Sequence, residues 1–126
     1  MTVLLDTSVL VGIEQGRLTP AQVSGEGAVS VVTLEELWLG VLRTPAPVQP
    51  RRRQTFEQAL GLYALLPVDA DVARACAEIR AEGRGRLIRY APFDSLIGAT
   101  ARVHGLPLLT QDIGMLGMLG VDVRVV

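Results

Sequence analysis

The sequence contains no lysine, so all 12 of its basic residues are arginines. This absence excludes phosphoacceptor receiver domains and haloacid-dehalogenase-type phosphatases, because both need a lysine in their acidic sites. It also excludes a P-loop, since no Gly-Lys pair occurs. The forked guanidinium of arginine suits phosphate groups, but a formal net charge of −1 indicates no general affinity for nucleic acid.

Cysteine and aromatic residues are scarce, and long hydrophobic runs are missing. The lone Cys76 cannot form an internal disulfide, which is compatible with the cytosol. Two Phe, two Tyr and one Trp are too few for a broad base-stacking surface. No apolar run approaches the roughly 18 residues that span a bilayer, and the first residues lack the basic stretch of a signal peptide. We therefore expect a cytoplasmic protein with no membrane segment.

The chain is rich in apolar residues for its size. It has 126 residues, of which 49% are hydrophobic, and a mean hydropathy of +0.37. This length suits a single domain over residues 1–126 with one real core. We expect the surplus apolar surface to be covered in an oligomer or by a tightly held partner.

Short β-type runs alternate with helical patterns along the chain. Apolar positions at 34, 37, 38, 41 and 42 predict an amphipathic helix, and the prolines of 43–50 predict a loop after it. The strands are expected at 3–5, 28–32, 107–110 and 121–126. The other helices are expected from 7 to about 16 and at 51–66, 70–82, 93–104 and 112–119, with a flexible connection at 83–86.

This alternation predicts an α/β fold in three layers. A central, mostly parallel sheet of four or five short strands would be flanked by helices on both faces. In such sheets ligands bind beyond the carboxyl ends of the strands. The residues that follow each strand are therefore the candidate functional residues.

Acidic residues occupy those positions. Asp6 ends the first predicted strand, Glu35 and Glu36 follow the second, Asp94 opens a helix, and Asp112 follows the strand at 107–110. Each has a structural alternative as a helix cap or first-turn acid, and the segment from 33 to 36 reads as a capping box. Taken together, up to four carboxylates at one sheet edge, with no lysine to neutralise them, favour a bound cation.

The residue types indicate which cation and which chemistry. Oxygen ligands without Cys or His pairs suit Mg²⁺ or Mn²⁺ rather than Zn²⁺. The lone His104 lies late in its helix and is interpreted as structural. A divalent metal held by carboxylates activates water and stabilises an in-line displacement at phosphorus. Phosphodiester cleavage is therefore the expected reaction class.

Four segments carry a resemblance to a known family. "LLDTSVL" (4–10), "SVVTLEELWLG" (30–40) and "PFDSLIGATARVHGLPLLTQD" (92–112), with "LLTQD" at its end, follow one another in the family's order. In this ordered set the chain resembles the PIN-domain ribonucleases, and within them the VapC-like toxins of bacterial toxin–antitoxin pairs. The resemblance covers essentially the whole chain.

The resemblance implies a role for each acid. Asp6, Glu36, Asp94 and Asp112 would form the catalytic quartet. Asp6, Asp94 and Asp112 would hold Mg²⁺ or Mn²⁺, while Glu36 would orient or deprotonate the attacking water. The match selects Glu36 because it precedes a leucine, with a glycine four residues after it. Helical periodicity leaves Glu35 open.

The resemblance also implies an endoribonuclease, a homodimer and a cognate antitoxin. Thr7, Ser8 and Thr110 are candidate hydroxyls for supporting the acids or contacting phosphate, with helix capping as the alternative. Structured RNA would be attracted by arginines, for which the candidates beside the glycine-rich connection are Arg84, Arg86 and Arg89. A solvated surface is the alternative for them.

Apolar residues of two successive helices could form a clip around a groove, or belong to the ordinary core. They are Leu37, Trp38, Val41, Leu42, Phe56, Leu60 and Tyr63. An amphipathic antitoxin segment would fit such a groove. Two functional alternatives stay open: a PIN nuclease of RNA processing without a toxin role, and a non-catalytic metal-binding interaction module.

Overall fold

A computed structural model describes residues 1–23 and 25–126. Five parallel strands form one sheet in the order β3-β2-β1-β4-β5. The strands are β1 (Thr2–Leu5), β2 (Glu26–Ser30), β3 (Ala64–Leu66), β4 (Leu108–Thr110) and β5 (Val123–Val125). The helices are α1 (Thr7–Glu14), α2 (Val31–Arg43), α3 (Gln49–Leu62), α4 (Ala70–Gly85) and α5 (Pro92–His104). Short 3₁₀ helices lie at Pro20–Gln22 and Ile113–Met115.

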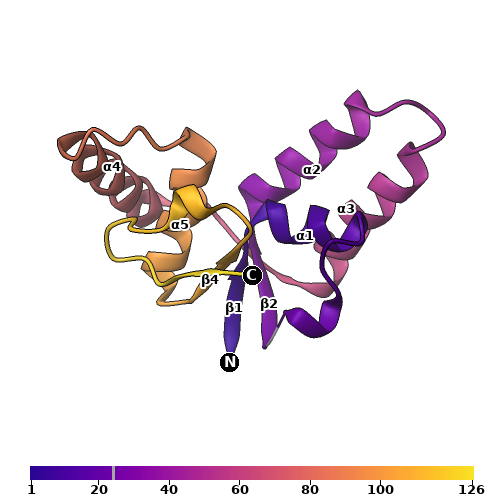
Figure 1. The fold of residues 1–126 in the computed structure, drawn as a ribbon, viewed down its shortest axis with the longest axis horizontal. Helices are drawn as coiled ribbons and strands as arrows, with labels where there is room; N and C mark the ends of the chain where they lie inside the picture. The colour runs from indigo at the N-terminus through magenta and orange to yellow at the C-terminus, as the bar shows by residue number, and fades with distance from the viewer. Residues whose placement is uncertain (24) are drawn as a thin grey trace.

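Helices cover both faces of the sheet, as predicted. Figure 1 shows α4 and α5 on one side of β1 and β2, and α1, α2 and α3 on the other. Leu4 faces the first group and packs with Ile79 and Ile97, while Val3 and Leu5 pack with Val9 and Leu37 on the opposite face. Alternate residues of one strand thus enter two cores, because successive side chains point to opposite faces. The three-layer α/β fold is confirmed.

Several predicted boundaries are wrong, and a local hydrogen bond explains the first of them. The second strand ends at Ser30, whose hydroxyl accepts from the Val32 N–H at 3.1 Å and starts α2 there. The capping box predicted for 33–36 does not form, because position 33 is already inside the helix. α4 continues through Gly85, so most of the connection expected at 83–86 is helical.

The remaining differences lie around α3 and after β4. The helix expected at 51–66 ends at Leu62, and Ala64–Leu66 instead pairs with β2 as an edge strand. Of the helix expected at 112–119, only Ile113–Met115 forms, as a 3₁₀ turn. The loop predicted at 43–50 is shorter, since Pro50 occupies the first turn of α3, where its missing N–H costs nothing.

The fold directs the carboxyl ends of β1 and β4 to one place. Leu5 pairs with Leu109, and the Asp6 N–H donates to the Leu109 carbonyl at 2.9 Å. The residues that follow these two central strands are therefore neighbours at the carboxyl edge. The next strands lie on opposite sides of this central pair, β2 beside β1 and β5 beside β4, so the strand order reverses between β1 and β4. This is the topological switch point at which parallel α/β proteins bind ligands.

Replacing Gly105 by Ala should lower the free energy of unfolding by about 1 kcal/mol. Gly105 ends α5 with φ 63, a left-handed conformation that Cβ disfavours, and no atom lies within 4 Å of the position that its Cβ would take. Urea unfolding measures the change. Gly61→Ala is the matched control: Gly61 lies inside α3, also in open space, and its substitution should stabilise. Equal effects of both variants would contradict the conformational explanation.

Candidate active site at the carboxyl edge of the sheet

Asp6 lies at the centre of the carboxyl edge and is only 4% exposed. It stands at the N-cap position of α1, but its side chain makes no capping hydrogen bond. Its Oδ2 instead accepts from the hydroxyls of Ser8, at 2.6 Å, and Thr110, at 2.8 Å. Within the described residues Oδ1 accepts no hydrogen bond and is available to a ligand. The capping alternative for Asp6 is therefore not realised.

Thr110 connects Asp6 to the segment that follows β4. The Thr110 hydroxyl, fully buried, accepts from the Asp112 N–H at 3.0 Å while donating to Asp6. Ser8 accepts from the Gln111 N–H at 3.0 Å. These contacts fix the path of the chain as it leaves β4, and so the position of the Asp112 backbone. Asp112 itself caps the 3₁₀ turn, since its Oδ1 accepts from Gly114 N–H at 2.8 Å.

Glu36 approaches the site from α2. Its Oε1 accepts from the Thr7 hydroxyl at 2.7 Å, and the same hydroxyl lies 3.0 Å from Thr33 Oγ1. Burial raises the pKa of the Glu36 carboxyl, the Thr7 hydrogen bond lowers it, and the negative charges of Asp6 and Glu35 raise it further. Glu35 is exposed. The geometry thus places Glu36, rather than Glu35, against α1.

Asp94 enters from the first turn of α5. That helix runs back along the sheet, so its first turn lies at the carboxyl edge although β4 follows it in sequence. Burial raises the pKa of Asp94 from 3.8 to about 6, and the charges of Asp6, Asp112 and Glu36 contribute in that order. The four predicted acids therefore act on one another electrostatically, as like charges gathered without compensation.

No arginine neutralises this group. In residues 1–23 and 25–126, none of the four acids forms an ion pair with a basic side chain. Over the same residues, no three His, Cys, Asp or Glu side chains come close enough to hold a metal ion between them. A cation here would bind some carboxylates directly and others through water. That arrangement fits Mg²⁺, which keeps several of its waters and is bound by one or two carboxylates.

Above about pH 6 the ionised Asp94 carboxylate, disfavoured first by burial and then by the neighbouring negative charges, should destabilise the metal-free protein. Because its pKa is about 6 in the folded chain against 3.8 ordinarily, the folded state binds more protons between these values, and stability falls as pH rises through them. Asp94→Asn should therefore raise the free energy of unfolding at about pH 7.5 by up to about 1 kcal/mol, allowing for solvent screening. At about pH 4.5 the gain should be smaller.

Urea unfolding of wild type and Asp94→Asn, with a chelator at both pH values, measures this difference. Asp122→Asn, which changes an exposed acid paired with Arg124, is the control and should show no such pH dependence. A gain from Asp94→Asn that is the same at both pH values would contradict the raised pKa.

Thr7, Ser8 and Thr110 were predicted to support the acids, but Thr33, which contacts Thr7, was not. Thr7, Ser8 and Thr110 all bind a carboxylate of the site, so none serves only as a cap. Thr33, expected to cap α2, is instead fully buried beside Thr7. Its position three residues after the end of β2 was the available signal.

The arginines beside α4 differ from one another. Arg86 is held within the molecule: it donates to Glu82 and Tyr90 and to the Gly117 carbonyl. Arg84 and Arg89 form no ion pair with any residue that the structure describes. Of the three arginines predicted to contact RNA, Arg84 and Arg89 therefore remain available to bind a phosphate.

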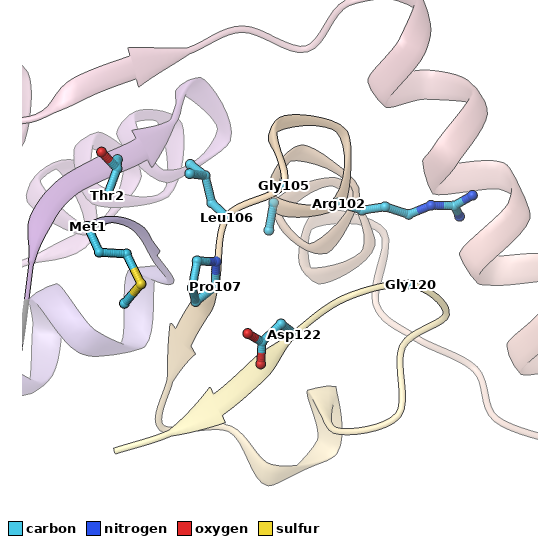
Figure 2. Close-up of a pocket in the computed structure, with 9 residues that line it drawn as sticks. Met1, Thr2, Arg102, Gly105, Leu106, Pro107, Gly120 and Asp122 are labelled. Carbon is cyan, nitrogen blue, oxygen red and sulfur yellow. The ribbon is translucent and has the colours of Figure 1, made fainter.

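A separate hollow of about 480 Å³ lies at the opposite, amino edge of the sheet. Figure 2 shows Arg102, Pro107 and Asp122 among the residues that line it, with Arg102 extended away from Asp122 toward α4, where it pairs with Glu78 at 2.7 Å. None of the four predicted acids lines this hollow. The acidic site and this cavity are distinct places in the fold.

The fold and the site together define a parallel α/β protein with an acidic centre at its switch point. Comparison with known proteins agrees: the profile of the PIN domain matches residues 3–116. The chain is 41% identical over 121 residues to Ribonuclease VapC4 of Mycobacterium tuberculosis, covering 95% of this chain and 93% of that protein. It is 40% identical to Ribonuclease VapC5 of the same organism, covering 86% and 82%.

A solved structure shows the same architecture. The crystal structure of VapBC-5, a member of the VapBC family of toxin-antitoxin systems from Mycobacterium tuberculosis, superposes with a TM-score of 0.83 at 32% identity. The match covers 99% of this chain and 97% of that one. The chain therefore belongs to the PIN-domain family, and within it to the VapC group. No helix in the described part of the chain is long and apolar enough to cross a membrane.

Proposed function

We propose that the protein is a divalent-metal-dependent endoribonuclease that acts as the toxin of a type II toxin–antitoxin pair. The observation that carries this proposal is the group of four acids, which has no basic partner among the described residues and in which burial, followed by the neighbouring negative charges, raises the pKa of Asp94 to about 6. The similarity to proteins named Ribonuclease VapC4 and VapC5 supports the same chemistry.

The proposed mechanism divides the work among the acids. Asp6, Asp94 and Asp112 would hold Mg²⁺ or Mn²⁺, directly or through water. A divalent cation there lowers the pKa of water and stabilises the charge on phosphoryl oxygens. Ser8 and Thr110 bind Oδ2 of Asp6 and so keep its Oδ1 directed to the ligand. These hydroxyls support the site from behind, as outer-shell partners of metal ligands do.

Glu36 is the proposed base. It would orient or deprotonate the attacking water. The oxygen of this water then forms the new bond to phosphorus as the bond to the 3′ oxygen of the ribose breaks. The products would carry 5′-phosphate and 3′-hydroxyl ends. The raised pKa of Glu36 makes it a stronger base, and the Thr7 hydrogen bond fixes one of its two oxygens. The other oxygen is left for the water.

Structured RNA is the proposed substrate, and an antitoxin protein is the proposed partner in the cytoplasm. Arg84 and Arg89 would contact RNA phosphates. The predicted clip is partly core, since Leu37 and Val41 are buried. Trp38 and Leu42, however, are 37% and 63% exposed.

The exposed part of the clip would receive the apolar face of the antitoxin. Trp38 packs on Phe56 with ring centroids 5.0 Å apart, and Leu60 on α3 is 46% exposed. These side chains form a surface between α2 and α3 that suits an amphipathic helix. A homodimer is proposed as the active form. The solved relative VapBC-5 belongs to a family of toxin-antitoxin systems, which supports a protein partner.

Incubation of the purified protein with total RNA tests the nuclease. Cleavage should require Mg²⁺ or Mn²⁺, stop when a chelator is added, and yield fragments with 5′-phosphate ends when the cut sites are mapped. Cleavage that persists in chelator, or no cleavage with either metal, would overturn the proposal. Co-expression with the protein encoded directly beside it should suppress the same cleavage, as expected of a toxin but not of an RNA-processing nuclease.

A further inference from the structure

Helix α4 ends in a Schellman motif, in which two N–H groups bond carbonyls of the last turn. The Leu87 N–H donates to the Arg84 carbonyl at 3.0 Å, and the Ile88 N–H donates to the Gly83 carbonyl at 2.8 Å. Leu87 adopts φ 63 and is the only non-glycine residue with a positive φ in the described part of the chain. This is the position at which helices favour glycine.

The end of α5 shows the same motif with glycine in place. The Gly105 N–H donates to the Arg102 carbonyl at 3.2 Å, and the Leu106 N–H donates to the Ala101 carbonyl at 2.9 Å. Gly105 also has φ 63. The chain thus meets one backbone requirement with glycine on α5 and with leucine on α4. The left-handed conformation is costly for a side chain with Cβ, so Leu87 is unfavourable for the helix end itself.

Packing does not explain Leu87 either. Its side chain is 96% exposed, the highest value among the exposed large hydrophobic residues of the described chain. It therefore buries nothing that could offset the backbone cost. A costly backbone conformation that no packing within the chain offsets is typical of residues with a functional contact, which makes Leu87 a candidate for a contact made outside this chain.

The turn that carries Leu87 is held in place from behind. The Arg86 guanidinium donates to Glu82 Oε2 at 2.9 Å, to the Tyr90 hydroxyl at 3.1 Å and to the Gly117 carbonyl at 3.2 Å. These bonds tie the end of α4 to the segment after β4. Arg86 is thus occupied, and Leu87 projects from a fixed support.

The surroundings of Leu87 favour a polyanion over an apolar protein surface. Arg84, Leu87, Ile88 and Arg89 line an open hollow of about 340 Å³. Arg84 and Arg89 have no ion-pair partner among the described residues. The hollow therefore combines two available guanidinium groups with the apolar side chains of Leu87 and Ile88. The phosphates of RNA can bind the guanidinium groups, and the face of an unstacked base can pack on the apolar side chains.

The hollow lies within reach of the acidic site. Asp94 lies seven positions after Leu87 in the sequence, so their Cα atoms are at most about 25 Å apart. An RNA strand with its scissile phosphate at the acids would pass the hollow a few nucleotides away. We propose that Leu87, between Arg84 and Arg89, is a specificity-determining contact that packs on an unpaired base of the RNA. This inference rests on the ribonuclease function proposed above.

Two variants of Leu87 test the inference without damaging the fold. Leu87→Gly and Leu87→Asn remove the apolar side chain and suit the left-handed conformation, so their thermal unfolding midpoints should equal or exceed that of wild type. With RNA whose cut site lies in an unpaired loop, KM should rise about tenfold while kcat stays unchanged. The pattern of cut sites in total RNA should also broaden.

Leu62→Asn is the matched control, because Leu62 on α3 is 73% exposed and should leave cleavage unchanged. If wild type cleaves and both Leu87 variants cut the same sites with the same KM, the inference is wrong although the nuclease stands. If they weaken self-association or antitoxin binding while cleavage is unchanged, the surface is a protein interface and the inference is also wrong. If wild type cleaves no RNA, both proposals fall.

Discussion

Replacing Asp6 by Asn is expected to lower the kcat/KM of metal-dependent RNA cleavage by about a thousandfold. The substitution keeps the shape of the side chain but removes the negative charge that would bind the cation. The protein should stay folded, because Asn retains one oxygen that can accept from Ser8 and Thr110, the two hydroxyls that bind Asp6. The loss would therefore concern the chemistry and not the core.

A single-turnover assay on a defined RNA measures this effect, with circular dichroism reporting the fold of each protein. Asp122→Asn removes an equal charge just before β5, at the opposite edge of the sheet, and should retain wild-type activity. Near-normal cleavage by folded Asp6→Asn at saturating Mg²⁺ would show that Asp6 is not a functional residue of the proposed site.

The central strands and their acids could be predicted from the sequence, because both signals are local. Val3–Leu5 is a short buried run that ends directly at Asp6. The parallel arrangement then follows from the alternation of strands and helices. Once the strands are parallel, their carboxyl ends share one edge. This reasoning predicted that the candidate acidic site would lie at the carboxyl edge of the sheet.

Features that depend on distant partners could not be predicted in this way. Ala64–Leu66 has only three residues and follows a helical pattern, so its pairing with β2 is the only thing that makes it a strand. The choice between Glu35 and Glu36 also lies outside α2. What distinguishes Glu36 in the structure is its hydrogen bond with the hydroxyl of Thr7, which belongs to α1. Helical periodicity describes one helix and contains no information about its neighbours.

The hydroxyl residues show how the fold supports a group of acids. Ser8 and Thr110 donate to Asp6, and Thr7 donates to Glu36. A neutral donor stabilises a carboxylate without forming the ion pair that an arginine would form. The negative charge therefore stays available to a cation, while the orientation of each side chain is fixed. No arginine forms an ion pair with these acids within the residues that the structure describes.

The second large effect is expected on kcat, where replacing Glu36 should act far more strongly than replacing the adjacent Glu35. Glu36→Gln should lower kcat by about a hundredfold, because general-base assistance contributes on this scale. Its carboxylate contacts Thr7 and interacts with Asp6, and its pKa is raised by burial. Glu35→Gln should leave kcat within about twofold of wild type, since Glu35 is exposed.

Both variants change one carboxylate to an amide on neighbouring residues of α2, so they are matched in charge and in helix propensity. Single-turnover kinetics at saturating metal measure kcat for each protein. KM should change little in either, because neither glutamate is assigned to binding RNA. If Glu35→Gln carried the loss instead, the water would have to lie on the exposed side of α2, away from Thr7 and Asp6. The contact between Glu36 and Thr7 would then serve only to join α1 to α2.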